Sequence, residues 1–306
     1  MNQTYIETVR LLLDIAPVIF EEPAFALKGG TALNLFVQDL PRLSVDIDVA
    51  FVPYNMEREA ALTRIEKALA RAKAQLLERG YAVESARVNR AEEVKLFVSD
   101  QNSLVKVEVN YVFRGTIFAP ERKPLSPKTQ SVFTTAVELP LLRTSELYGG
   151  KMVAALDRQH PRDWFDVWKM RETLGIPPEF VDAFVIYLAG HNRPVHEVLY
   201  GTFKDLSALF DAEFNGMTSE PIALALLEQT RQWLLAELPR MLTNNHKEFL
   251  LSLVKATPKW DLLGVDHLEH LPGIKWKLLN LGKLAKKDSA RFQAQYVLLA
   301  DKFNAG

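Results

Sequence analysis

The chain has 306 residues, of which 48% are hydrophobic and 25% are charged, and its formal net charge is −1. This composition is ordinary for a globular protein, and the balanced charge argues against binding polyanions indiscriminately, although it leaves room for a local basic patch. The sequence contains no cysteine, which excludes a disulfide framework and thiolate catalysis.

The sequence also bounds the location and the number of domains. No stretch approaches the about 18 consecutive apolar residues of a membrane span, and residues 1–4 do not resemble a signal peptide. We therefore expect no membrane partner and a cytoplasmic location. At this length we expect two domains. Strand signals fade from about residue 176, so we expect a mixed α/β domain over residues 1–175 and a helical domain over residues 176–306.

The first predicted elements form a strand–turn–helix–strand unit. Apolar residues at helical spacing predict a helix over residues 4–20, and residues 25–27 predict a short strand that ends in a Gly29-Gly30 turn. Thr31 is predicted to be the N-cap of a helix over residues 32–38. Residues 45–52 then alternate as a half-buried strand.

This unit carries the parts of a phosphate and metal site. The N–H groups at the start of a helix bind phosphate oxygens, and glycine lets a ligand approach the backbone closely, so Gly29, Gly30 and Thr31 are candidate phosphate-binding residues. Asp46 and Asp48 lie on the same face of the predicted strand, because they are two residues apart. Paired carboxylates suit Mg²⁺, which bridges to phosphate.

The rest of the chain predicts a mixed sheet followed by helices. We expect a helix over residues 56–79, strands over 81–88, 94–98 and 104–113, and a proline-rich connector over 119–127. Helices follow over 144–156 and from Pro161, and helical patterns dominate from about residue 176. The predicted class is α+β, with a mixed sheet, flanking helices and an all-helical C-terminal domain.

Glu108 is the best candidate for a third metal-binding acid. It lies on the polar face of the strand over 104–113. Two-metal phosphoryl transfer usually needs a third acid from a neighbouring strand to hold a metal, and Glu108 could supply it. The alternative interpretation is a surface glutamate paired with Lys106 or Lys95. Glu92 and Glu93, in a predicted turn, are weaker candidates.

A second group of charged residues lies further along the chain. Lys151 lies on the helix over 144–156 and offers a mobile charge to a triphosphate, and Asp163 and Asp166 open the next helix. The alternative is that Lys151 pairs with one of these acids and fastens the two helices together.

The C-terminal stretch from Pro272 is rich in cations, which suits contact with RNA phosphates, although a solvated helix face explains the same pattern. Its cationic residues are Lys275, Lys277, Lys283, Lys286, Lys287, Arg291 and Lys302.

These motifs together resemble those of a known family. Gly-Gly-Thr at 29–31, the Arg42-X-Ser44-X-Asp46-X-Asp48 run, Lys151 and the Arg162-Asp163-X-X-Asp166 run resemble the AbiEii/AbiGii toxins of abortive-infection and toxin–antitoxin pairs. These toxins belong to the nucleotidyltransferase superfamily that includes DNA polymerase β.

The resemblance implies a function and a set of site residues. It implies transfer of a nucleotide from an NTP to an acceptor, with Mg²⁺, with tRNA or another RNA 3′ end as the acceptor, and with an antitoxin as a partner. The residues that match the family motifs are Gly29, Gly30, Thr31, Arg42 and Ser44 for the nucleotide, Asp46 and Asp48 for the metal, and Lys151 with Asp166 or Asp163 for catalysis. The competing functions are a metal-dependent phosphodiesterase and a module that binds NTP or an antitoxin without turnover.

Overall fold

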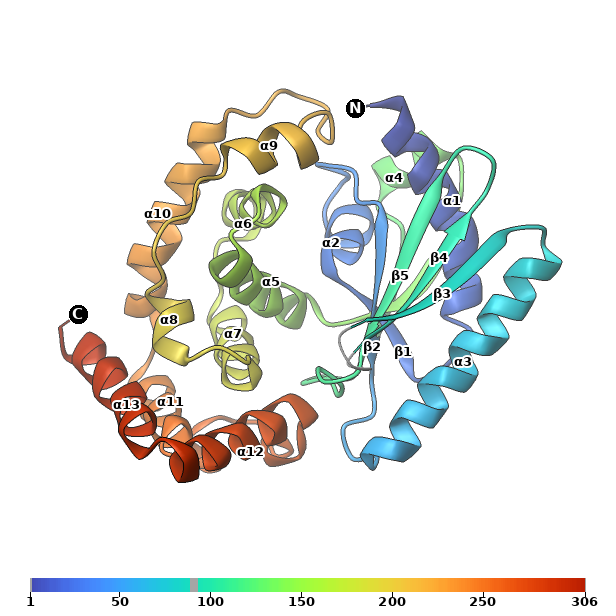
Figure 1. Ribbon diagram of the computed structural model, residues 1–306. Coiled ribbons are helices and arrows are strands. Elements are labelled where there is room, and N and C mark those ends of the chain that lie inside the picture. Colours follow the sequence, from blue (N-terminus) through green and yellow to red (C-terminus); the bar gives the residue numbers. More distant parts are fainter. Residues whose placement is uncertain (1, 89–92, 306) are drawn as a thin grey trace. The chain divides into compact units, whose positions relative to one another are not determined.

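The computed structural model describes residues 2–88 and 93–305, and the chain folds into two compact units. The first unit comprises Met1–Leu147 and Asn215–Ile222, and the second comprises Tyr148–Phe214 and Ala223–Gly306. Figure 1 gives the element labels used below.

The first unit is built on one sheet with helices around it. Its strands are β1 (Phe25–Lys28), β2 (Asp46–Phe51), β3 (Ala82–Val88), β4 (Glu93–Ser99), β5 (Leu104–Asn110), β6 (Glu121–Pro124) and β7 (Glu138–Leu141). Its helices are α1 (Gln3–Ile19), α2 (Gly29–Thr31) with the π-helical turn η1 (Ala32–Val37), α3 (Arg58–Glu78) and α4 (Pro127–Phe133).

The sheet has seven strands in the order β3-β4-β5-β2-β1-β7-β6. β2 pairs in parallel with β5, and β1 pairs in parallel with β7, whereas the other neighbours are antiparallel. The mixed sheet of the predicted α+β class is thereby confirmed. The strand β2 lies at the centre, so the residues on its two faces decide what the sheet buries and what it presents.

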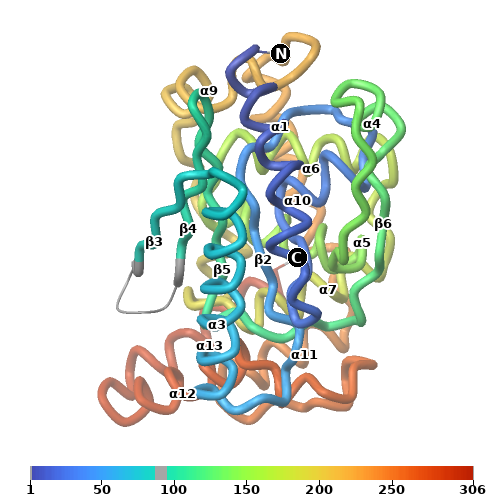
Figure 2. Tube along the Cα trace, turned by 90° about the vertical axis from the view of Figure 1, so that its right-hand side faces the viewer, coloured from blue at the N-terminus to red at the C-terminus, as the bar shows by residue number. Residues whose placement is uncertain are grey.

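Helices α1 and α3 pack against each other and lie on one side of the sheet, as Figure 1 shows and as the view in Figure 2 shows from their side. In β2, Ile47, Val49 and Phe51 are buried, whereas Asp46 and Asp48 on the opposite face are partly exposed. This alternation is the one expected of a strand with one apolar face.

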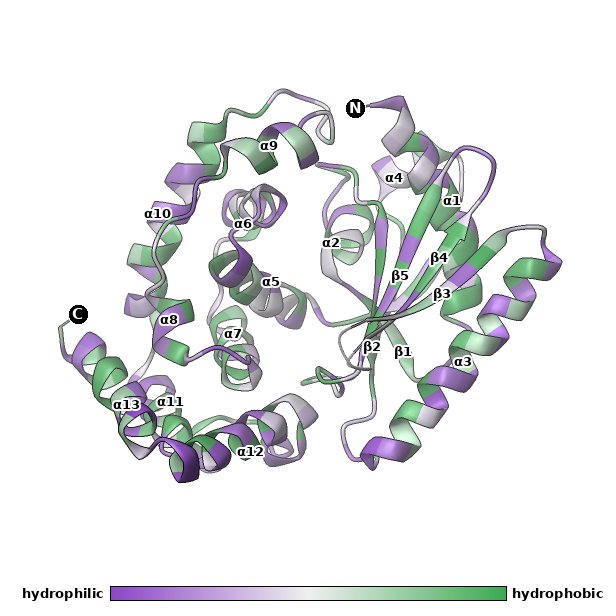
Figure 3. Cartoon of the chain, in the orientation of Figure 1, coloured by the Kyte–Doolittle hydropathy of each residue, from purple (hydrophilic) through white to green (hydrophobic). Residues whose placement is uncertain are grey.

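In the described part of the second unit the secondary structure is entirely helical. Helix α5 (Thr144–Arg158) begins in the first unit and continues into the second, where it is followed by α6 (Pro161–Leu174), α7 (Pro178–Gly190), α8 (Val195–Leu199), α9 (Ser207–Glu213), α10 (Leu224–Met241), α11 (Asn244–Val254), the short turns η2 (Trp260–Leu262) and η3 (Leu268–His270), α12 (Pro272–Lys287) and α13 (Ser289–Asn304). Helix α7, mostly hydrophobic in Figure 3, contacts α8, α10, α11 and α12. It therefore forms the centre of this unit.

The division of the chain falls earlier than the predicted boundary at residue 175. A side chain at Gly149 would place its Cβ 2.6 Å from the backbone nitrogen of Phe184, so α5 approaches α7 at backbone contact distance. The Tyr148 ring stacks on Phe180, with ring centroids 5.2 Å apart. Because of this packing, α5 and α6 group with the helices that follow them.

Three local predictions were wrong. The predicted connector over 119–127 contains β6, an edge strand that ends at Pro124, which is where a sheet tolerates proline. Glu93 begins β4 and does not lie in a turn, because the strand continues to pair with β3 and β5 there. Glu92 lies outside the described residues. The helix predicted from residue 32 begins three residues earlier, at Gly29, and its N-cap is Lys28.

No helix in the described ranges has both the length and the apolar character needed to cross a membrane.

Candidate active site

The Gly29-Gly30 turn lies directly against the acidic strand β2. Gly29 has a φ of +73°, in the left-handed region that favours glycine. A Cβ at Gly29 would lie 2.0 Å from Oδ2 of Asp48, and a Cβ at Gly30 would lie 2.9 Å from Oγ of Ser44. Only residues without side chains allow the backbone of this turn to approach these polar groups so closely.

The Thr31 side chain joins the turn to β2 and does not cap its own helix. Its hydroxyl donates to the backbone oxygen of Asp46 and lies 3.0 Å from Oγ of Ser44. Thr31 and Ser44 are both buried. The N-cap prediction was therefore wrong, because a contact with a strand distant in sequence engages the hydroxyl.

Arg42 holds the segment that leads into β2. It is buried, and its Nη1 donates to the backbone oxygen of Leu43 over 2.8 Å. A Cβ at Gly30 would lie 2.8 Å from the other terminal nitrogen of Arg42, so this guanidinium also lines the glycine turn. The chain returns to the same place at residues 215–222, where Leu43 donates its N–H to the oxygen of Met217. Arg42 and Ser44, predicted from the motif, thus lie together with Gly30.

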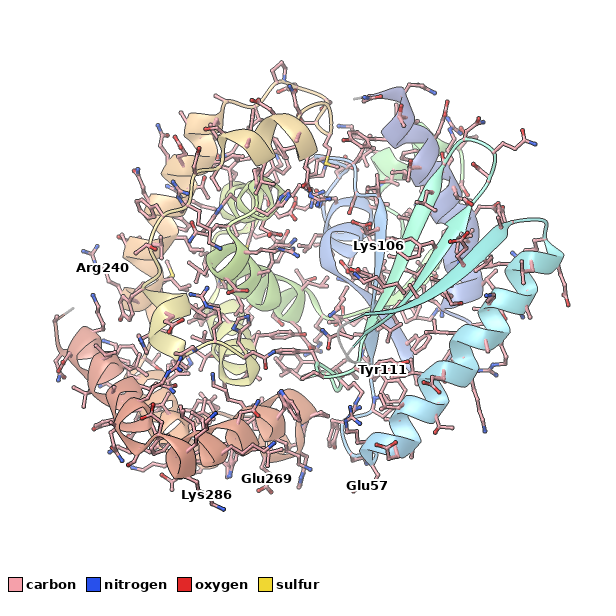
Figure 4. The ribbon with its side chains drawn as sticks, in the orientation of Figure 1. Glu57, Lys106, Tyr111, Arg240, Glu269 and Lys286 are labelled. Carbon is pink, nitrogen blue, oxygen red and sulfur yellow. The ribbon has the colours of Figure 1, made fainter. Side chains whose placement is uncertain are left out.

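Charged side chains form two rows across the sheet on the face of Asp46 and Asp48. In the first row the strand register aligns Lys28, Asp48, Glu108 and Lys95, so that a lysine stands at each end of a pair of acids. Residues in register on neighbouring strands have their side chains on the same face, so these residues are direct neighbours. In the second row Asp46 lies beside Lys106, which Figure 4 labels on β5.

Lysines share the carboxylates of this face. Lys106 Nζ lies 3.3 Å from Oε1 of Glu108 and 3.6 Å from Oδ1 of Asp46, and Lys95 also pairs with Glu108. Burial on its own would raise the pKa of Glu108, but the hydrogen bond from Lys95 and the charge of Lys106 outweigh it and lower the pKa below its usual value. The alternative interpretation of Glu108, as a partner of Lys95 or Lys106, therefore describes its contacts in this structure.

The carboxylates of this face are the candidate ligands for a divalent cation. The donors on β2 are carboxylate oxygens, which suit Mg²⁺, and the Gly29 backbone lies directly against the carboxylate of Asp48. However, no group of three or more histidine, aspartate or glutamate side chains within residues 2–88 and 93–305 is arranged to hold a metal ion. A cation at Asp46 would compete with Lys106 for that carboxylate, and one at Glu108 would compete with Lys95 and Lys106.

Lys151, Asp163 and Asp166 lie together in the second unit. Lys151 Nζ is 3.0 Å from Oδ1 of Asp163 and 2.8 Å from Oδ2 of Asp166, and all three side chains are buried. Small residues before Lys151 allow the close packing of α5, and Pro161 starts α6 so that both acids lie in its first turns. The contacts match the interpretation in which Lys151 fastens two helices.

Arg158 completes this cluster, although the sequence patterns assigned it no role. Its Nη2 donates to Oδ1 of Asp163 over 2.8 Å. Burial would raise the pKa of Asp163, but the charges of Lys151 and Arg158 lower it well below its usual value. The position of Arg158 in the last turn of α5, shortly before the acids of α6, was the available signal.

Comparison with known proteins identifies the family. A family model described as "Nucleotidyl transferase AbiEii toxin, Type IV TA system" matches residues 10–277. The chain belongs to the AbiEii family of nucleotidyltransferase toxins. The match includes both charged clusters, and it confirms the resemblance that the motifs indicated. As a member of this family the chain is a nucleotidyltransferase with a nucleotide substrate and an antitoxin partner.

Comparison with solved structures shows a similar fold. MenT4, a nucleotidyltransferase toxin from Mycobacterium tuberculosis H37Rv, shares 15% sequence identity with this AbiEii-family chain at a TM-score of 0.56. The similarity covers 89% of this chain and 92% of MenT4. At this identity the likeness shows a shared fold. No curated protein matches the chain.

Proposed function

We propose that this toxin transfers a nucleoside monophosphate from an NTP to the 3′ hydroxyl of an RNA, with tRNA as the foremost acceptor, and that it requires Mg²⁺. The acceptor oxygen forms a bond to the α-phosphorus, the bond from that phosphorus to the bridging oxygen breaks, and pyrophosphate leaves with the electron pair. The acceptor hydroxyl loses its proton to solvent. We expect enzyme and RNA to meet in the cytoplasm.

The observation that carries the proposal is the contact between the glycine turn and the acid of β2. Gly29 presents its backbone to the carboxylate of Asp48 with no room for a Cβ between them. Phosphate oxygens bound to the N–H groups at Gly29 and Gly30 would therefore lie beside the carboxylates that bind their counterion. A metal-dependent phosphoryl transfer site needs this proximity.

Each candidate site residue of the first unit has a role in the proposal. Asp46 and Asp48 would hold the cation, which would supply charge neutralisation for the phosphates. Thr31 fixes β2 against the turn through the Asp46 backbone, so it positions the acids. Arg42 and Ser44 line the turn at Gly30 and offer donors to the nucleotide. Glu108, which now pairs with Lys95 and Lys106, would hold a second cation.

For Lys151, Asp163 and Asp166 we propose the role that the family motif implies. Lys151 would give its charge to the triphosphate, and the two acids would hold its ammonium in place. Lys151→Arg keeps the charge, whereas Lys151→Met removes it. If transfer is rescued by arginine and the unfolding midpoints of the two variants agree, the charge itself contributes to activity. If both variants are active whenever they are folded, Lys151 only fastens the helices.

The reaction is tested with the purified protein, total RNA and each NTP labelled at the α-phosphate. The proposal predicts labelled RNA and one pyrophosphate for each nucleotide added, with both lost in EDTA and restored by Mg²⁺. Shortened RNA without incorporation would establish a phosphodiesterase, and NTP binding without either product would establish a binding module. Either of these results contradicts the proposed transfer.

The toxin assignment has a separate test in cells. Expression of the chain should stop growth, and coexpression of a neighbouring gene product should restore it. Expression of Asp48→Asn should be harmless if toxicity comes from the transfer reaction. Toxicity that survives this substitution would separate the growth defect from the β2 acids.

A further inference from the structure

A pocket in the second unit lies far along the chain from the family motifs. It has a volume of about 240 Å³ and lies among α12, α13 and the turn between α7 and α8. Its lining residues are Asn192, Pro194, Lys277, Asn280, Leu281, Leu284, Arg291 and Gln295. The lining contains two cations and three amides but no acid, so its charge favours an anion.

Lys277 is the buried cation of this pocket. Only 3% of its surface is exposed, and its ammonium donates to the backbone oxygen of Arg193 over 2.6 Å and lies 3.4 Å from that of Asn192. Within the described ranges its contacts are these carbonyls, and it forms no ion pair with a carboxylate. A buried ammonium without a counter-charge is costly, and an anion in the pocket removes that cost.

The ammonium of Lys277 is still charged at neutral pH. Burial lowers its pKa to about 8, and the charge of Glu197 opposes this effect only in part. An ammonium has three N–H donors, and two carbonyls accept from this one. One donor is therefore available to a ligand.

Gln295 provides a second and independent sign of a ligand. Its side chain lines the pocket and is 93% buried, since 7% of its surface is exposed. Within the part of the chain that the structure describes, its amide has no hydrogen-bond partner. Neither amide atom of Gln295 is among the fully buried unpaired atoms, so the amide is open to the pocket and available to a polar occupant.

We propose that this pocket binds a phosphate group. The Lys277 ammonium and the Gln295 amide donate from the buried side, and Arg291 and Asn280 donate from the neighbouring turns of α13 and α12. Ammonium and guanidinium groups together are the donors that proteins use for phosphate oxygens. The volume equals that of about eight liquid waters, so a phosphate group fits with part of the molecule that carries it.

The test is a calorimetric titration of the 306-residue chain with inorganic phosphate, in a buffer that is itself free of phosphate. Because phosphate has a candidate site at Gly29 as well, two classes of site are fitted. Lys277→Met and Arg291→Gln should weaken one class about tenfold or more. Lys286→Met is the matched control, since Lys286 lies on the same helix and is exposed (Figure 4). It should bind like the wild type.

Arg291→Gln keeps the test decisive if Lys277→Met does not fold. The Arg291 side chain is exposed, and its backbone N–H bond to Asp288 survives the substitution. Equal phosphate binding by the wild type, Arg291→Gln and the control would overturn the proposal. A final titration identifies the source of the phosphate: displacement by a single-stranded RNA assigns it to a nucleic acid backbone, and retention assigns it to a small phosphate ester.

Discussion

Replacement of Gly29 by alanine perturbs the candidate active site in a way that the structure quantifies. The new Cβ would lie 2.0 Å from Oδ2 of Asp48, whereas real Cβ contacts are essentially never shorter than 3.0 Å. Turn and carboxylate must therefore separate by at least about 1 Å, and misplacement by about 1 Å in an active site reduces rates about a hundredfold. We expect Gly29→Ala to reduce nucleotide transfer by about this factor.

Alanine at a positive φ also destabilises the fold, and a matched variant separates the two effects. Gly29 has a φ of +73°, where a residue with a Cβ costs about 1–2 kcal/mol. Gly80 has a φ of +90°, and a Cβ added there would have no atom within 4 Å. Gly80→Ala should therefore lose similar stability but keep its activity.

The assay measures kcat for nucleotide incorporation and the free energy of unfolding in urea for both variants. If Gly29→Ala retains wild-type kcat while folded, the close approach of the turn to Asp48 is not needed for transfer. If Gly80→Ala loses as much activity as Gly29→Ala, the loss reflects general destabilisation. Either result would refute the reasoning from the 2.0 Å contact.

Three further predictions concern the charged clusters. Lys106→Met removes the cation that competes for two carboxylates, so half-maximal activity should need about two- to fivefold less Mg²⁺; a higher requirement would contradict this competition. Asp163→Asn leaves the buried ammonium of Lys151 short of a counter-charge and should lower the free energy of unfolding by about 3–5 kcal/mol, measured in urea; a loss below about 1 kcal/mol would refute the burial argument. The hydrogen bond from His191 lowers the pKa of Asp157 from 3.8 to about 2. A carboxyl group whose pKa is lower in the folded than in the unfolded state stabilises the fold at pH values above the unfolded pKa. Between about pH 5 and pH 2 the free energy of unfolding of the wild type, measured in urea, should therefore fall by about 2 kcal/mol more than that of Asp157→Asn; equal decreases would contradict this linkage.

The features that follow from short-range patterns were predictable from the sequence. The alternation in β2 places Asp46 and Asp48 on one face, because side chains of a strand alternate whatever its neighbours are. The junction between strand and helix at Gly29-Gly30 follows from the break between an apolar strand and a helix, although the helix itself begins at Gly29. The helices that begin near Thr144 and at Pro161 follow from spacing and from the preference of proline for a first turn.

The features that depend on strand order were not predictable. The pairing of Glu108 with Lys95 requires β4 beside β5, and the pairing of Lys106 with Asp46 requires β5 beside β2. The sequence offered the lysine partners of Glu108 as one alternative, but periodicity within a strand contains no information about its neighbours. The Thr31 hydroxyl illustrates the same limit, since its partner lies across the turn on another strand.

The division of the chain was also set by packing between distant segments. Gly149 approaches Phe184 at backbone distance, and this contact groups α5 with helices that the sequence pattern assigned to another domain. A glycine in a helix indicates close packing, but it does not identify the partner.

The most direct test of the central claim compares Asp48→Asn with the wild type in the incorporation of labelled NTP into RNA. This substitution keeps the size of the side chain but removes the charge that would hold the cation. Asp211→Asn, on the exposed helix α9, is the matched control. We predict that Asp48→Asn loses incorporation by about a thousandfold, with an unchanged unfolding midpoint and a control as active as the wild type. Incorporation by Asp48→Asn at the wild-type rate would contradict the claim that the β2 acids carry the reaction.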